Sequence, residues 1–170
     1  VYSIAPWLSA VTNFGMHRMP FGIALRPTKY LENLEDYRFK QAALDVAYEG
    51  KGKISKIIMN HDELQYSYQI PENKLKKGDN KITVEMSTQA NPQNILAKST
   101  VMLKDIKMAE GQVVYDVMAY GKNVVAFLNL SGDIQILNNS GERVQTSKQV
   151  LDDMSFFEFD GRGKFKIILE

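Results

Sequence analysis

Two histidines and a set of acidic side chains are the groups in this sequence that could perform acid–base or metal chemistry. His17 and His61 are the only histidines, and the chain has no cysteine. A zinc site needs several converging ligands, and neither an HxH nor an HExxH spacing is present. His61 follows Asn60 and precedes Asp62, residue types that favour a tight turn, so we interpret it as an exposed turn residue. The sequence therefore predicts no metal site.

Paired carboxylates could supply the acid and the base, or the nucleophile, of glycoside hydrolysis. The candidates are Glu32, Glu35-Asp36, Asp62-Glu63 and Asp152-Asp153. None of them is singled out, because acidic residues in turns are usually solvated and no apolar surroundings predict a raised pKa. A GxSxG elbow and a GxxxxGK[ST] phosphate loop are both missing from the sequence. We therefore predict no catalytic residue and no cofactor in this chain.

Aromatic side chains offer a different kind of site, because sugar rings stack on tryptophan and tyrosine. The candidate carbohydrate-binding residues are Trp7, His17, Arg18, Tyr30 and Tyr37. His17 and Arg18 belong to NFGMHRMPFG, an aromatic and basic loop that could line a groove or pack over the open end of a sandwich. Trp7 could instead fasten the domain to a preceding one.

Tyr66 and Tyr68 are a further aromatic pair. They lie two residues apart in a predicted strand, so they should project from one face. Ile70 shares their phase, which favours a continued core face over an exposed stacking platform.

Charge and hydropathy exclude several classes of partner. The chain of 170 residues has 21 Lys and Arg against 20 Asp and Glu, so it lacks the basic excess of a nucleic-acid-binding protein. No run of about eighteen apolar residues predicts a membrane span. Hydrophobic residues make up 44% of the chain, enough for a buried core. The start at Val1 rather than Met leads us to expect a piece of a longer protein, with any export signal upstream.

The elements that would position these groups are predicted mainly from hydrophobic periodicity. The first forty residues are irregular, whereas 42–87 predicts four strands in a row, with turns at 50–52 and 60–62 and a lysine-rich loop at 74–80. Further strands are predicted at 100–106, 113–120, 124–130, 134–137, 154–159 and 164–169, with turns at 121–123, 131–133, 139–141 and 160–163. Roughly ten strands and no long amphipathic helix indicate an all-β, antiparallel β-sandwich.

The domain organisation leaves two alternatives. We predict one β-sandwich domain over residues 1–170, or two sandwich-like units over 1–88 and 97–170. The segment 88–96 is the internal boundary in the second case, because it is polar, contains Pro92 and has no periodicity.

One stretch carries a family resemblance. LDVAYEGKGKISKIIMNHDEL, followed by QIP and by LKKGDNKITVEM, resembles the C-terminal β-sandwich domain of large bacterial glycoside hydrolases whose catalytic domain is a helical barrel. The resemblance implies a non-catalytic accessory domain that supports the catalytic domain or borders its substrate groove. The partners it implies are that catalytic domain and a polysaccharide, and the location is periplasmic or extracellular. No catalytic residue carries over, because the acids of that family lie in the barrel.

Two other hypotheses stay open. A stand-alone carbohydrate-binding module would capture glycan through Trp7 and tyrosines, whose rings would then have to be accessible. A cell-surface adhesion or assembly domain would need a large exposed apolar patch or a free edge strand.

Overall fold

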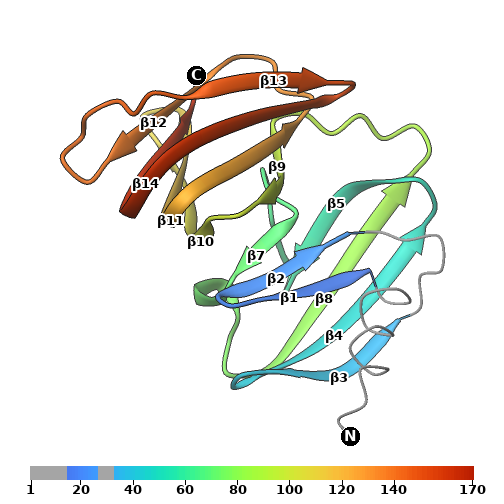
Figure 1. Ribbon diagram of the computed structural model, residues 1–170. Coiled ribbons are helices and arrows are strands. Elements are labelled where there is room, and N and C mark those ends of the chain that lie inside the picture. The colour runs from blue at the N-terminus through green and yellow to red at the C-terminus, as the bar shows by residue number, and fades with distance from the viewer. Residues whose placement is uncertain (1–14, 27–32) are drawn as a thin grey trace, which may run out of the picture.

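The computed structural model describes residues 15–26 and 33–170. Within these ranges the chain forms fourteen strands and one short 3-10 turn, and the strands make three sheets (Figure 1). The predicted all-β, sandwich-like fold is confirmed. No helix in the described part of the chain is long and apolar enough to cross a membrane.

The strands fall into two groups along the sequence, eight before residue 88 and six after residue 94. In chain order they are β1 (Met16–Met19), β2 (Gly22–Leu25), β3 (Leu34–Phe39), β4 (Ala42–Gly50), β5 (Lys53–Met59), β6 (Asp62–Glu63), β7 (Gln69–Pro71), β8 (Gly78–Ser87), β9 (Ile95–Ser99), β10 (Met102–Ala109), β11 (Gln112–Leu128), β12 (Ile134–Asn138), β13 (Ser147–Leu151) and β14 (Met154–Leu169), with the 3-10 turn η1 (Glu72–Lys74) between β7 and β8.

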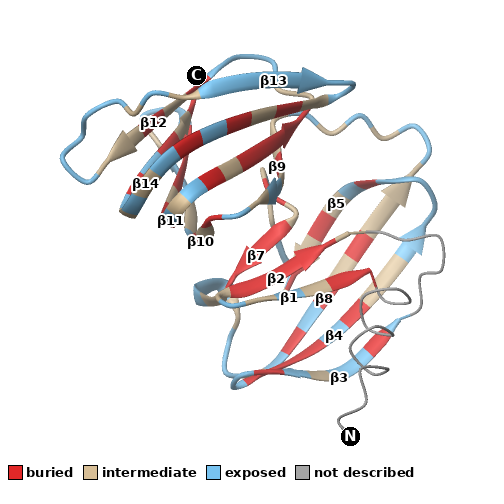
Figure 2. Ribbon diagram, viewed as in Figure 1, coloured by how far each residue is buried: buried red, intermediate tan, exposed pale blue. Residues whose placement is uncertain are grey.

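The first group forms a two-layer sandwich. The sheet β1-β2-β7 lies on one face of the sheet β3-β4-β8-β5-β6, and the apolar core fills the space between them. Ile23 and Ile70 enter this core from the small sheet, and Leu44, Ile57 and Val84 enter it from the large one. Figure 2 shows the alternation of buried and exposed positions along β8, which a strand with one buried face requires.

The order of strands in the large sheet differs from the order along the chain. β4 and β5 are consecutive, yet β8 lies between them, parallel to β4 and antiparallel to β5. The predicted turn at 50–52 therefore crosses the end of β8 instead of closing a hairpin. A Cβ at Gly50 would stand 2.2 Å from the Met86 carbonyl oxygen, and one at Gly52 would stand 2.5 Å from that of Ser87, so this crossing requires glycine.

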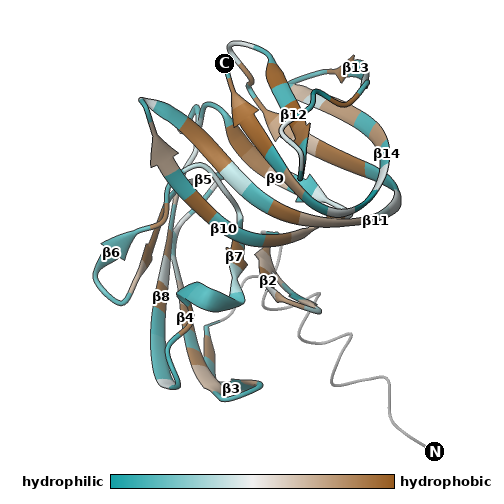
Figure 3. Ribbon diagram, turned by 90° about the vertical axis from the view of Figure 1, so that its left-hand side faces the viewer, coloured by the Kyte–Doolittle hydropathy of each residue, from teal (hydrophilic) through white to brown (hydrophobic). Residues whose placement is uncertain are grey.

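The second group is built around one long pair of strands. β11 and β14 pair from Val114↔Ile168 at one end to Leu128↔Met154 at the other. β10 and β12 flank one half of this ladder, and β9 and β13 flank the other half. Figure 3 shows the curvature of both long strands.

This curvature folds the sheet over on itself. A straight ladder of this length would span roughly 45 Å, at about 3.3 Å per residue. Ile134 nevertheless pairs with Leu169 at one end, although it follows Leu128, at the other end, by only six residues, which reach about 20 Å at most. The two halves thus enclose a core, in which the Phe127 ring packs edge-to-face on Tyr115 and Phe157.

The predicted turns at 121–123 and 160–163 are wrong, because the chain continues there as two paired, bent strands. Gly121 pairs with Gly161 at the bend. The buried Asn123 side chain accepts a hydrogen bond from the Tyr120 N–H (3.1 Å) and donates to the Gly121 carbonyl. The residue types that favour a turn serve here to bend two strands together.

The buried apolar residues form two clusters, one drawn from residues 16–84 and the other from residues 96–169. The segment 88–94, between β8 and β9, connects them, so the predicted boundary at 88–96 overlaps the start of β9. Tyr66 packs against the second cluster and Tyr68 against the first, so the prediction that they share one face is wrong. The positive φ of Tyr66 (66°) breaks the alternation that the sequence pattern implies.

Candidate functional site

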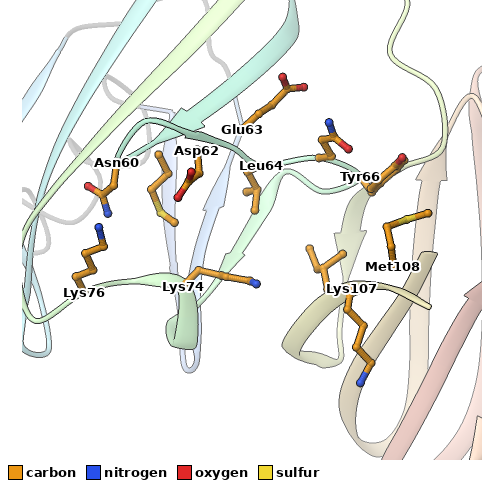
Figure 4. A pocket seen from close by; sticks show the side chains of 12 residues that line it. Asn60, Asp62, Glu63, Leu64, Tyr66, Lys74, Lys76, Lys107 and Met108 are labelled. Carbon is orange, nitrogen blue, oxygen red and sulfur yellow. The ribbon is translucent and has the colours of Figure 1, made fainter. Parts of the chain in front are cut away.

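The first group of strands, β1–β8, is called the first unit below, and the second group, β9–β14, the second unit. A cleft of about 310 Å³ lies where the β5–β6 hairpin of the first unit approaches β10 of the second unit (Figure 4). The hairpin is tight, as predicted, with positive φ at Asn60 (52°) and His61 (79°). The segment through η1 forms another wall, which brings lysines opposite the hairpin. The lining includes Asp62, Leu64, Tyr66, Lys74, Lys76 and Met108. The cleft therefore combines an apolar wall with charged groups of both signs.

Most of the charged groups around the cleft are already paired. Lys74 forms an ion pair with Asp105 (3.3 Å), Glu63 pairs with Lys56 (3.4 Å), and Lys107 pairs with an acid on β11. Figure 4 shows Glu63 turned away from Lys74 and the ammonium of Lys107 directed away from Tyr66. These pairs are exposed to solvent, which screens their charges, so they contribute little to the stability of the fold.

Two charges are left for a ligand. Asp62 and Lys76 form no ion pair within the described part of the chain. Asn60 sits beside them, and its Nδ2 donates to the Asn80 Oδ1 (3.0 Å). Asn80 in turn accepts a hydrogen bond from the Lys76 N–H (2.8 Å). The buried Asn80 thus fixes the backbone of one cleft lysine and the side chain of the neighbouring amide.

The pKa of Asp105 is set by opposing effects of burial and hydrogen bonding. Partial burial by itself would raise the pKa of Asp105. Hydrogen bonds from the Asn73 side chain, the Ile106 N–H and Lys74 outweigh that effect and lower the pKa. The carboxylate therefore stays charged at neutral pH, which suits an ion pair that joins η1 to β10 and not a proton donor.

The arrangement supports binding better than hydrolysis. Glycoside hydrolysis needs two carboxyl groups on opposite sides of the bond, one of them in surroundings that raise its pKa. The acids that line this cleft are Asp62 and Glu63, neighbours on one short strand, and Glu63 turns outward. The apolar wall of Leu64, Tyr66 and Met108 instead offers a contact surface beside polar groups, as in many ligand-binding sites.

The predicted carbohydrate-binding residues lie elsewhere. Trp7 and Tyr30 are outside the described residues. His17 and Arg18 lie on β1, an edge strand, and Tyr37 lies on β3, an edge strand of the other sheet. His17, Arg18 and Tyr37 form no hydrogen bond or ion pair with one another. None of these three lines the cleft of Figure 4.

Arg18 is exposed, and His17 and Tyr37 are partly buried. The Arg18 guanidinium carbon lies 5.4 Å from the centre of the Phe39 ring, a cation–π contact across the two sheets. Partial burial, with the charge of Arg26, lowers the pKa of His17. Tyr37 is half-buried against the first core. In the described residues, therefore, this region does not present a row of exposed rings.

The cleft could not be predicted from local sequence patterns. Lys74 and Lys76 lie in the predicted lysine-rich loop, and Asp62 lies in a predicted turn. Their function as one site depends on the approach of β10, about thirty residues further along the chain. The spacing of residues that are neighbours in the sequence does not indicate a contact with such a distant strand. Among the described residues, no group of three or more histidine or acidic side chains could hold a metal ion.

Comparison with known proteins adds no neighbour: no protein-family model, no curated protein and no solved structure matches the chain. The resemblance to glycoside hydrolase C-terminal domains therefore rests on sequence pattern alone, chiefly that of residues 44–86.

Proposed function

We propose that this chain is a non-catalytic accessory β-sandwich domain of a bacterial carbohydrate-active enzyme, periplasmic or extracellular, which supports a catalytic domain or borders its substrate groove. The observation that carries the proposal is the make-up of the cleft, whose acids and lysines are arranged for contact and not as an acid–base pair. The sequence resemblance supplies the substrate class.

The side chains that line the cleft are of the types that bind saccharides. Sugar rings have CH-rich faces that pack on apolar and aromatic side chains, and hydroxyl groups that bond to carboxylates, amides and ammonium groups. Tyr66 and Met108, which is 56% exposed, form the apolar side, and Asp62, Asn60 and Lys76 form the polar side. Its volume of about 310 Å³ lies at the lower end of the range for small-molecule sites, ~300–1,000 Å³.

The first test is for catalysis. The purified chain is incubated with neutral and with uronic-acid polysaccharides, and new reducing ends or unsaturated products are measured. We expect no turnover above a buffer blank. Turnover that disappears in Asp62→Asn or Glu63→Gln would overturn the proposal, because it would make the chain an enzyme.

A second candidate function, a module that captures glycan by itself, is favoured by the apolar wall of the cleft. Calorimetric titration with oligosaccharides tests it. Tyr66→Ala should lower the affinity about tenfold or more, whereas Tyr120→Ala should leave it unchanged, because the Tyr120 ring is 61% exposed and lies outside the cleft. Absence of binding for every saccharide would remove this second function and leave the accessory role standing.

A further inference from the structure

A second cleft, larger than that of Figure 4, lies at the bend of β11 and β14 and has a volume of about 590 Å³. One wall is formed by residues 122–124 of β11 and 158–160 of β14, and the other by residues 144–147, which lead into β13. None of these residues lines the cleft of Figure 4. The volume falls within the range of small-molecule sites, ~300–1,000 Å³. The second cleft is therefore a separate candidate site, which lies wholly in the second unit.

The connection between β12 and β13 shapes this cleft (Figure 1). β12 pairs with β14 from residue 165 onward, and β13 pairs with it up to residue 158, so residues 159–164 of β14 pair with β11 only. The connection is held at one end of this gap by a hydrogen bond from the Val144 N–H to β12 (2.8 Å) and at the other by the pairing of Ser147 with β14. The two residues between these anchors belong to no strand. The cleft thus occupies a gap in the sheet that is fixed on both sides.

Cross-strand pairing places four side chains on one face at the bend. Lys122 pairs with Asp160, and Val124 pairs with Glu158. Residues directly opposite each other, and residues two apart on one strand, project from the same face of a sheet. Ser147 lies opposite Glu158 on the other side of β14 and joins them. These five side chains therefore form one surface, on which a partly buried valine lies among polar groups.

The polar side chains at the surface of the second cleft have no partner within the described part of the chain. They supply two carboxylates, one ammonium, two hydroxyl groups and one amide, and they are Lys122, Gln145, Thr146, Ser147, Glu158 and Asp160. None of these side chains forms an ion pair or a hydrogen bond to another described residue. In the cleft of Figure 4, by contrast, Glu63, Lys74 and Lys107 are already paired. The second cleft thus offers a full set of donors and acceptors to a ligand.

We propose that the second cleft binds a neutral segment of a glycan through the carboxylates of Glu158 and Asp160 and the hydroxyl groups of Thr146 and Ser147. The choice of a saccharide rests on the proposed function. A saccharide presents many hydroxyl groups, and each of them can donate to a carboxylate and accept from a hydroxyl or an ammonium group. Hydrogen bonds to the charged carboxylates are the strongest of these. Val124 adds a small apolar surface beside the polar groups.

The charge of the second cleft selects a neutral saccharide over an acidic one. Two carboxylates and one ammonium are among its lining residues, so the lining has an excess of negative charge. A uronic acid would bring a further carboxylate next to Glu158 and Asp160, and like charges repel. The cleft of Figure 4 differs in sign, because three of its lining residues are lysines and two are acids. We therefore expect the two clefts to favour different sugars.

A nuclear magnetic resonance titration of the isotope-labelled chain tests the proposal. The probes are oligosaccharides of neutral glucan, xylan and mannan, with oligogalacturonate as the acidic counter-probe. We expect a neutral probe to shift the amide signals of residues 122–124, 145–147 and 158–160, and to bind there about tenfold more tightly than oligogalacturonate. Tyr66→Ala, in the cleft of Figure 4, should leave these shifts in place.

Glu158→Gln and Asp160→Asn keep the size of each side chain but replace a charged acceptor with a neutral amide, so each should weaken binding of the neutral probe about tenfold. Glu49→Gln changes an exposed acid of the first unit that lines neither cleft, and this matched control should bind as the wild type does.

Three results would each overturn the proposal: no probe shifts these signals, oligogalacturonate binds here as tightly as the neutral probes, or the two carboxamide variants bind as the control does. All three concern binding at the second cleft. The proposed function fails through turnover instead, so the two failures are distinguishable.

Discussion

Asn80 and Asn123 illustrate how single buried polar residues hold this structure. The Asn80 amide nitrogen donates to the carbonyl groups of Lys76 (2.8 Å) and Gly78 (2.9 Å), while its oxygen accepts from the Lys76 N–H (2.8 Å). The Asn123 side chain likewise forms hydrogen bonds with the backbone of Tyr120 and Gly121 at the bend of β11. A local pattern of asparagine and glycine predicts a loop or turn. It does not indicate that the side-chain amide of the asparagine is buried and hydrogen-bonded.

We expect Asn80→Ala to lower the free energy of unfolding by about 2 kcal/mol, because it leaves buried backbone groups without partners. Asn139→Ala, at an exposed position, should change it by less than about 0.5 kcal/mol. Urea denaturation followed by circular dichroism measures both. Equal effects of the two substitutions would contradict the assigned role of Asn80.

The buried tyrosines predict an alkaline limit of stability. Burial, with a smaller contribution from the charge of Asp153, raises the pKa of Tyr68 from 10.0 to about 12. Burial also raises the pKa of Tyr48 and of Tyr115. A group whose pKa is higher in the folded state contributes stability that is complete below the unfolded pKa and is lost as the pH rises through the folded pKa. The stability from Tyr68 should therefore be lost between pH 10 and about 12.

Ultraviolet titration of the phenols checks this expectation. Three of the eight tyrosines, Tyr48, Tyr68 and Tyr115, should ionise above the ordinary tyrosine pKa of about 10, together with the loss of structure seen by circular dichroism. Tyr68→Phe should remove one late-titrating group. Ionisation of all eight near pH 10 in a protein that stays folded would show that these rings are not shielded.

At the scale of elements, sequence patterns predicted strands better than connections. The alternation of apolar residues in 44–48, 54–59 and 82–86 indicates strands that the structure confirms as parts of β4, β5 and β8. The pairing of β4 with β8 and the continuity of β11 and β14 were not predicted. Both depend on a partner strand that lies far away in the sequence, and glycine and asparagine occur alike in turns and in bends of paired strands.

The crossing between β4 and β5 gives a matched test of glycine. Gly50 and Gly121 have the same φ, +86°, but a Cβ at Gly50 would meet the Met86 carbonyl oxygen at 2.2 Å, whereas one at Gly121 would meet nothing within 4 Å. Gly121→Ala should cost about 1 kcal/mol of stability from backbone strain alone. Gly50→Ala should cost at least about 2 kcal/mol more, because β8 must move. Denaturation midpoints that coincide would show that the crossing tolerates a side chain.

On the scale of the whole molecule, the two cores are joined by contacts along one seam. The Leu96 N–H donates to the Tyr66 carbonyl (2.9 Å), and the Tyr115 hydroxyl donates to the same oxygen (2.8 Å). The Lys104 ammonium lies 4.0 Å from the centre of the Phe21 ring. The cleft of Figure 4 opens at this seam, so its shape depends on how the units are held together. For that reason the strands could be predicted from sequence and the cleft could not.

We expect the two units to unfold in one cooperative transition, because the seam contacts are shared between their backbones. Tyr115→Phe keeps the ring in the second core but removes one of the two donors to the Tyr66 carbonyl, which should lower the free energy of unfolding by about 1 kcal/mol and weaken the coupling. Differential scanning calorimetry measures both effects, with Tyr120→Phe as the exposed control. Two separate transitions in the wild-type chain would show that the seam does not couple the units. An unchanged Tyr115→Phe protein would show that the hydroxyl contributes nothing to the seam.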